Sequence, residues 1–297
     1  MAIAAVRVPG WEAQPDVWLL IAGLAAGYRI AVVRVGPRFA VPGRPIVTRL
    51  QVTCWVLGVA ATWVASDWPV HIVAERMNYS VHMVQHLLFA MVAAPLMLLG
   101  TPSWLARWIL HPPSRLFRAV RSLSRFLPAL VLFNLVLVLT HWPWLVNESL
   151  SSGVVHFSVH ALLFVSSLIV WMPVLSPLPE IPRLAAPVRA AYLFLQSIVP
   201  TVPASFLTFG SDPLYKFYEG LPHIWGLTTL EDQQMAGLIM KIGAGLLLWA
   251  LIAVFFFRWA ADEERRQRPQ MRRELDQELA RMGLSQVTTG RSGELHA

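Results

Sequence analysis

The chain has 297 residues, of which 56% are hydrophobic and only 14% are charged, and its formal net charge is +7. Soluble domains carry roughly 25% charged residues, so this composition excludes an ordinary soluble protein and indicates an integral membrane protein. The positive charge does not indicate nucleic-acid binding, because the arginines gather in particular connections between apolar segments.

Seven apolar segments are long enough to cross a bilayer as helices, which takes about 20 residues each. The predicted spans cover residues 17–35, 50–68, 79–100, 126–146, 153–175, 188–209 and 234–259. Pro200 and Pro203 should kink the sixth span or end it early. We therefore predict an all-α, polytopic membrane protein whose residues 1–259 form a seven-transmembrane-helix bundle. Residues 260–297 are expected to form a charged cytoplasmic tail.

The basic residues of the connections predict the orientation of the bundle. Arginine is frequent after the first, third and fifth spans and in the tail, whereas the alternate connections hold only Arg76 and Lys216. Basic residues remain on the cytoplasmic side of most membrane proteins. We therefore expect the N-terminus outside and the C-terminus in the cytoplasm.

The third span, VHMVQHLLFAMVAAPLMLLG, carries polar side chains in its first turns. His82 and His86 are four residues apart, so they share one face of a helix. A second pair, His156 and His160 in HFSVH, has the same spacing at the start of the fifth span. Polar groups in hydrocarbon are costly unless they pair, face a cavity or hold an ion. One such pair alone favours hydrogen bonding between helices, whereas two pairs favour a shared site.

The predicted orientation brings further polar side chains to the same depth, just beneath the outer surface. They are His141 at the end of the fourth span, Asp67, His71 and Glu75 around the connection after the second, and Asp232 and Gln233 at the start of the seventh. Imidazoles from three different helices thus converge within about two helical turns of one face.

Several chemistries can use such a cluster. Imidazoles at this spacing can share a transition-metal ion such as copper, zinc or iron, and the thioethers of Met83 or Met240 would favour cuprous copper. Haem ligation by paired histidines, a path for protons or substrate, and a hydrogen-bonded layer that fixes helix register are the alternatives. The two matched pairs favour the metal site.

The third span also resembles a known signature. HMVQHLLFAMVAAPLMLLG followed by Pro102 is similar to the CtaG family of cytochrome c oxidase assembly factors, which are found beside caa-type oxidases in bacteria. The segments THWPW, HFSVH, WMP and EDQQMAGLIMK resemble other landmarks of that family in the same order, so the resemblance covers roughly residues 50–259. Lys241 departs from the pattern, because the relatives tend to continue with tryptophan at this point.

The resemblance implies a multi-pass protein of the bacterial plasma (inner) membrane that helps to assemble the oxidase by handling copper for one of its copper centres. The family's landmark positions fall on His82, His86, His141, His156, His160, Asp232 and Gln233. We expect His82, His86, His156 and His160 to be the ligand core, His141 to be a fifth or alternate ligand, and Asp232, Gln233, Met83 and Met240 to surround them.

The expected cargo is a copper ion, and the expected partners are cytochrome c oxidase subunits, a periplasmic copper chaperone and membrane lipids. Nothing in the sequence indicates bond-making chemistry, so a non-enzyme is predicted. A haem-binding membrane electron carrier and a copper or proton transporter are the alternative functions. The transporter is less favoured because the polar side chains reach only halfway through the membrane, and leucine, valine and phenylalanine follow them.

Overall fold

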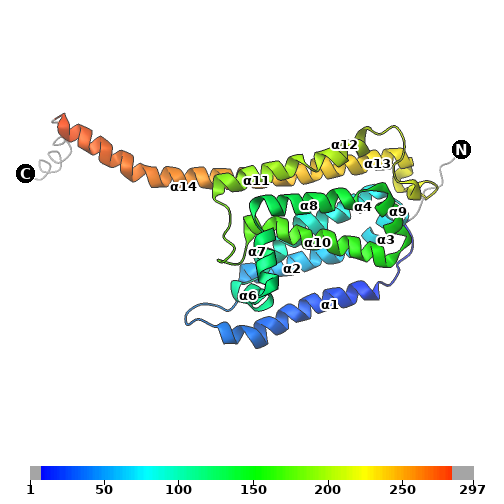
Figure 1. Ribbon diagram of the computed structural model, residues 1–297, viewed down its shortest axis with the longest axis horizontal. Helices are drawn as coiled ribbons and strands as arrows, with labels where there is room; N and C mark the ends of the chain where they lie inside the picture. The colour runs from blue at the N-terminus through cyan, green and yellow to red at the C-terminus, as the bar shows by residue number, and fades with distance from the viewer. Residues whose placement is uncertain (1–7, 283–297) are drawn as a thin grey trace, which may run out of the picture.

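The computed structural model describes residues 8–282, and none of these residues forms a β-strand. Its long helices lie side by side along one direction (Figure 1). Within residues 8–282, six helices are long and apolar enough to cross a membrane, and a seventh span is present if the bent pair α7 and α8 counts as one. The predicted all-α, polytopic architecture is therefore confirmed.

The first half of the chain forms three spans and two short helices that follow them. The first span is α1 (Pro15–Ile30), continued by a π-helical turn η1 (Ala31–Val35) and a 3-10 turn η2 (Gly36–Phe39). The second span is α2 (Arg49–Ser66), followed by the short helix α3 (Val70–Arg76). The third comprises α4 (Tyr79–Leu87), a π-helical segment η3 (Leu88–Ala93) and α5 (Ala94–Gly100). Two short helices follow, α6 (Ser103–Leu110) and α7 (Arg115–Leu123).

The second half forms the remaining spans. They are α8 (Phe126–Thr140), then the short α9 (Pro143–Ser151), then α10 (Gly153–Leu175), then α11 (Ala186–Ile198) with α12 (Thr201–Phe209). After the 3-10 turns η4 (Lys216–Tyr218) and η5 (Ile224–Gly226), the last span is α13 (Thr229–Leu238), the π-helical turn η6 (Ile239–Gly243) and α14 (Ala244–Arg281).

The third span lies at the centre of the bundle. α2 and α10 pack against α5, while α3 and α13 pack against α4. A larger share of this span is buried than of any other candidate span within residues 8–282. Around it, large apolar side chains such as Leu19 and Phe209 are exposed, which is the pattern of a surface that faces lipid.

Two predicted boundaries were wrong for local reasons. The fourth span ends at Thr140 rather than at residue 146, because Pro143 begins α9 and the preceding Trp142 is extended, as is usual before proline. The seventh begins at Thr229 rather than at residue 234, because Thr228 and Glu231 form a capping box that starts the helix. The predicted break in the sixth span is confirmed, since α11 and α12 are separate helices with Pro200 between them.

The C-terminal helix crosses the predicted domain boundary without a break. α14 runs from Ala244 to Arg281, so residue 259 lies inside one continuous helix (Figure 1). The division into a bundle and a tail therefore stays a prediction, and residues 283–297 of that tail lie outside the described residues.

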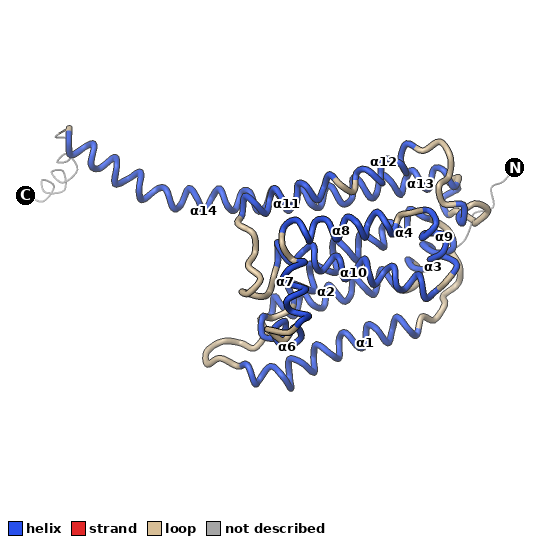
Figure 2. The backbone as a smooth tube through the Cα atoms, in the orientation of Figure 1, coloured by secondary structure: helices blue, strands red, loops and turns tan. Residues whose placement is uncertain are grey.

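The bundle has two distinct ends. α3, α9 and the starts of α4, α10 and α13 lie together at one end, which we call the histidine end, and α6 and α7 lie at the other (Figure 1). Figure 2 shows the long connection between α12 and α13 at the histidine end. The predicted histidines are carried by the elements that meet here.

A close contact between α12 and α13 gives a test of this packing. A Cβ atom on Gly237 would lie 2.8 Å from the carbonyl oxygen of Ala204 and against the hydroxyl of Thr208. We expect Gly237→Ala to destabilise the protein by about 1–3 kcal/mol, because the helices must separate. Thermal unfolding in detergent measures this. Gly245→Ala is the control, because nothing lies near its Cβ position, and equal stability of the two variants would contradict the close packing.

Candidate metal centre

The first pair of imidazoles comes from the N-terminal half of α4. His82 and His86 are both buried, one turn apart on the helix, with their ring centroids 4.3 Å apart. The helix places them on its inner face because α4 is enclosed by α3, α13 and η6. The sequence prediction that these two side chains share one buried face is therefore consistent with the structure.

The second pair comes from the start of α10. His156 and His160 have ring centroids 4.3 Å apart, and the ring of His160 lies 5.0 Å from that of His86 and 5.4 Å from that of His82. The imidazole pair of α4 and that of α10 therefore lie against each other. They do not point outward into lipid.

Three of these side chains form a compact group. His82, His86 and His160 each offer a ring nitrogen, and the three nitrogens lie within 4.8 Å of one another. Within residues 8–282, both ring nitrogens of His86, Nδ1 of His82 and Nε2 of His160 are buried without a hydrogen-bond partner. An unpartnered buried polar atom costs about 1–3 kcal/mol, so four such atoms in one place suit a bound ion. We call these three residues the three-histidine group.

His141 lies beside this group at the end of α8. Its ring is 5.5 Å from that of His86, and its Nδ1 lies 2.7 Å from the carbonyl oxygen of Leu137. A carbonyl oxygen only accepts, so Nδ1 carries the proton and Nε2 keeps its lone pair. That Nε2 atom is buried and has no hydrogen-bond partner among the described residues.

A small cavity lies beneath His86 and His141. Its volume is about 30 Å³, and Met83 and Met240 are among the side chains that line it. Met91, which is not among the residues predicted from the sequence, lines it as well. Both predicted thioethers are thus near the imidazoles, and Met240 reaches this position from the π-helical turn η6.

His156 belongs to a second group. Its Nε2 lies 3.2 Å from Oε1 of Glu75, and the same carboxylate oxygen lies 3.4 Å from Nε2 of His71. The ligand atoms of these three residues are also within 4.8 Å of one another. His71 and Glu75 are predicted from the sequence to lie at this depth but not to be ligands, because the short helix α3 that brings them one turn apart was not predicted.

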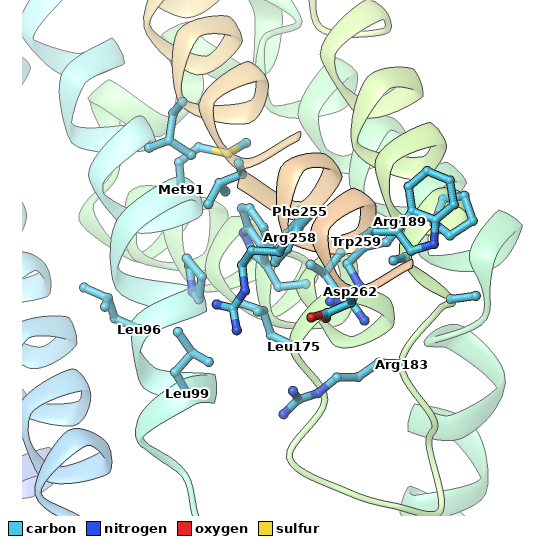
Figure 3. Close-up of a pocket in the computed structure, with 18 of the residues that line it drawn as sticks. Met91, Leu96, Leu99, Leu175, Arg183, Arg189, Phe255, Arg258, Trp259 and Asp262 are labelled. Atoms are coloured by element: carbon cyan, nitrogen blue, oxygen red, sulfur yellow. The ribbon is translucent and has the colours of Figure 1, made fainter. Parts of the chain in front are cut away.

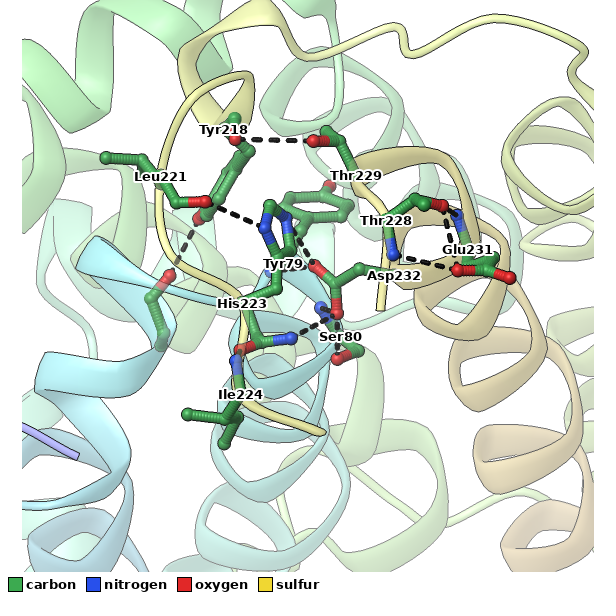
Figure 4. A network of polar contacts seen from close by, with 12 residues as sticks. Tyr79, Ser80, Tyr218, Leu221, His223, Ile224, Thr228, Thr229, Glu231 and Asp232 are labelled. Atoms are coloured by element: carbon green, nitrogen blue, oxygen red, sulfur yellow. Dashed lines mark hydrogen bonds and ion pairs between the residues drawn. The ribbon is translucent and has the colours of Figure 1, made fainter. Parts of the chain in front are cut away.

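Asp232 belongs to the first turn of α13, and its fully buried carboxylate lies against the N-terminus of α4. It accepts hydrogen bonds from the backbone of Tyr79 (2.6 Å), from the side chain of Asn78 (2.9 Å) and from the hydroxyl of Ser80. Its nearest imidazole contact is with His223, at 4.0 Å (Figure 4). A carboxylate is favoured at a helix N-terminus, where the backbone N–H groups lack partners. Asp232 therefore contacts the start of α4 rather than the four predicted ligands.

Gln233, next to Asp232, holds the connection that covers the histidine end. Its side-chain oxygen accepts a hydrogen bond from the backbone of Leu214 at 2.6 Å. Lys241, where the sequence departs from the resemblance, is exposed on η6 and so does not enter the cluster.

A much larger cavity of about 930 Å³ lies near the opposite end of the bundle (Figure 3). Its lining combines apolar side chains with Arg183, Arg189 and Arg258. None of the predicted ligands lines it. The candidate metal centre is therefore the imidazole cluster, although the space there is small.

The fold and the cluster together define a polytopic, all-helical membrane protein with converging imidazoles buried at one end. A family model described as "Cytochrome c oxidase caa3 assembly factor (Caa3_CtaG)" matches residues 26–262, the bulk of the chain. The chain belongs to this family of cytochrome c oxidase assembly factors, as its motifs predicted. Comparisons with curated proteins and with solved structures found no match.

The contacts of Asp232 give a test of how α4 is held. We expect Asp232→Asn to lower the free energy of unfolding by about 2 kcal/mol, because the charge-assisted bonds to Tyr79 and Ser80 weaken and one acceptor becomes a donor. Asp212→Asn makes the same chemical change on an exposed loop and should stay within about 0.5 kcal/mol of the wild type. Chemical unfolding in mixed micelles, followed by tryptophan fluorescence, would reveal the difference; its absence would remove the proposed role of the carboxylate.

Proposed function

We propose that this assembly factor binds a copper ion in the three-histidine group and delivers it to a subunit of cytochrome c oxidase. The observation that carries the proposal is the meeting of three buried imidazoles whose ligand atoms lie within 4.8 Å of one another. Imidazole is a good ligand for copper, and the oxidase that the family assembles contains copper centres. The role is one of binding and transfer, with no bond-making chemistry.

The chemistry of the surrounding side chains supports copper as the cargo. The cavity beside His86 has about 30 Å³, enough for a water molecule or a bare ion. Thioethers select cuprous copper over harder ions, and Met83 and Met240 line that cavity. His141 presents a free Nε2 on the same side, so the ion has further soft or neutral ligands next to the three imidazoles.

We place the histidine end at the outer face of the bacterial plasma membrane. The proposal rests on the arginine-rich connections, which favour the cytoplasmic side for the opposite end. A site just beneath the outer surface is accessible to a periplasmic copper chaperone as donor and to an oxidase subunit as acceptor. In this arrangement the exposed apolar side chains of α10 and α14 are in contact with lipid.

The alternative functions are less well supported by the packing. A haem needs a slot the size of a macrocycle, whereas the cavity at His86 and His141 has room for a single small ligand. A transporter needs a polar path through the bundle, whereas Phe133, Leu137 and Leu163 lie below the imidazoles, buried in the apolar core. Binding and release at the histidine end therefore fit better than electron transfer or passage.

Copper content tests the proposal directly. The purified protein should bind about one copper ion per chain, and the double variant His82→Ala/His86→Ala should lose it, because two of three imidazole ligands are gone. His86→Leu should lose copper as well while keeping the site filled with an apolar side chain. Elemental analysis after dialysis against a weak chelator gives the stoichiometry.

The matched control is His111→Asn. His111 is exposed at the other end of the bundle and has a positive φ of 47°, which asparagine tolerates. This variant should keep its copper. Unchanged copper content in the double variant would remove His82 and His86 from the ligand list.

A second test concerns the oxidase itself. A bacterial strain that lacks this protein should make the oxidase polypeptides but show little oxidase activity, because a copper centre stays empty. Activity assays and immunoblots of isolated membranes measure the two quantities separately. Complementation with the wild-type protein should restore oxidase activity, whereas complementation with His86→Leu should not. Full oxidase activity in the deletion strain would argue against a role in assembling the oxidase by copper delivery.

A further inference from the structure

A second group of potential ligands lies between the three-histidine group and the surface. His71 and Glu75 are one turn apart on α3, and His156 faces them from α10. The side chains of His71 and Glu75 are 17% and 28% exposed, whereas those of the three-histidine group are buried or nearly so. An ion that arrives from the outer face therefore meets this second group first.

The hydrogen bonds around His71 define what each member can do. The side-chain amide nitrogen of Gln85 donates to the carbonyl oxygen of Ala65 at 2.7 Å and lies 3.2 Å from Nδ1 of His71. An amide nitrogen cannot accept, so Nδ1 of His71 accepts and the ring proton is on Nε2. Nε2 of His71 lies 3.4 Å from Oε1 of Glu75, so His71 lies against the carboxylate and its protonated nitrogen is not a free ligand.

Glu75 and His156 keep the lone pairs that a metal ion needs. The two ring nitrogens of His156 have no hydrogen-bond partner among the described residues, although Nε2 is within ion-pair distance of Glu75. A carboxylate oxygen and an imidazole nitrogen 3.2 Å apart can both bind one transition-metal ion. Ligating carboxylates are commonly positioned by a neighbouring polar group, and Nε2 of His71 is within ion-pair distance of Glu75 here.

His156 also adjoins the deeper group. Its ring centroid lies 4.3 Å from that of His160 and 6.0 Å from that of His82. A small rotation of this ring would let an ion exchange a His156 bond for a His160 bond. The two groups therefore adjoin along α10, on which His156 and His160 are one turn apart.

We propose that Glu75 and His156 form an outer receiving site, which takes up the copper ion and passes it by ligand exchange to His82, His86 and His160. The inference rests on the proposed function, since it assigns the route by which the same cargo reaches its resident site. His71 is a positioning residue for Glu75. In the transfer the metal–nitrogen bond to His156 and the metal–oxygen bond to Glu75 break as metal–nitrogen bonds to His160, His82 and His86 form, and the oxidation state of the ion does not change.

Loading kinetics test this route. Copper is supplied as a coloured complex with a chelator, and the loss of colour reports its uptake by the purified protein, under reducing conditions for cuprous and without reductant for cupric copper. We expect Glu75→Gln and His156→Asn to slow loading by about 10-fold or more, yet to reach the wild-type copper content at the end, because the resident ligands are intact. His71→Phe, which keeps an aromatic ring but loses the nitrogen that lies against Glu75, should slow loading with the same final copper content.

Glu148→Gln is the matched control. Glu148 is exposed on α9 at the same end of the bundle, so the variant removes the same charge without touching the receiving site and should load like the wild type. Equal final copper content in all these proteins shows that they are folded around the resident site.

The possible results separate the two proposals. Wild-type loading rates in Glu75→Gln and His156→Asn would overturn the receiving site and leave the copper centre in place. Loss of bound copper in either variant would also overturn it, because that residue would then belong to the resident site. A wild-type protein that takes up no copper would overturn the proposed function itself.

Discussion

The carboxylate of Asp232 joins the two helices on which the site depends. It lies at the start of α13 and accepts hydrogen bonds from the first residues of α4, which carries His82 and His86. The same helix run continues into η6 and so brings Met240 against the imidazoles. A fully buried carboxylate is tolerated here because the N–H groups at a helix N-terminus satisfy it. The register between α4 and α13, and hence the shape of the site, follows from this one interaction.

Polar satisfaction divides the buried side chains at the histidine end into two kinds. Asp232, Gln233 and Gln85 each have at least one hydrogen-bond partner that ties helices or loops together, although Oε1 of Gln85 and Nε2 of Gln233 have none among the described residues. Both ring nitrogens of His86 and Nε2 of His160 have none in the same part of the chain. A layer that only fixed helix register would give His86 at least one hydrogen bond, as each of these amides has. The contrast therefore favours a ligand role for the histidines over a purely structural one.

Spacing alone predicted much of this arrangement, and local backbone changes explain the rest. The four-residue spacing of His82 with His86 and of His156 with His160 requires only an α-helix, so both pairs could be placed before the fold was known. The π-helical segments could not be predicted, because they shift the helix register by one residue without a sequence signal. Met91 reaches the cavity from η3, where the indole of Trp171 donates to the carbonyl oxygen of Ala90 at 2.8 Å. His156 likewise lies beside Glu75, in a group separate from the other imidazoles, because Glu75 is placed there by α3. That helix is too short to be predicted by its periodicity.

The charges of the two groups explain why the ion would move on rather than stay. The three imidazoles are neutral ligands, so a copper ion bound to them keeps its full positive charge in a buried, low-dielectric layer, where an uncompensated charge is costly. The carboxylate of Asp232 already accepts hydrogen bonds from the start of α4. Glu75, at the outer edge, lies 3.2 Å from Nε2 of His156, so its negative charge acts most strongly on an arriving ion. In the proposed function, an acceptor with anionic ligands would therefore remove copper from the three-histidine group, as delivery to an oxidase subunit requires.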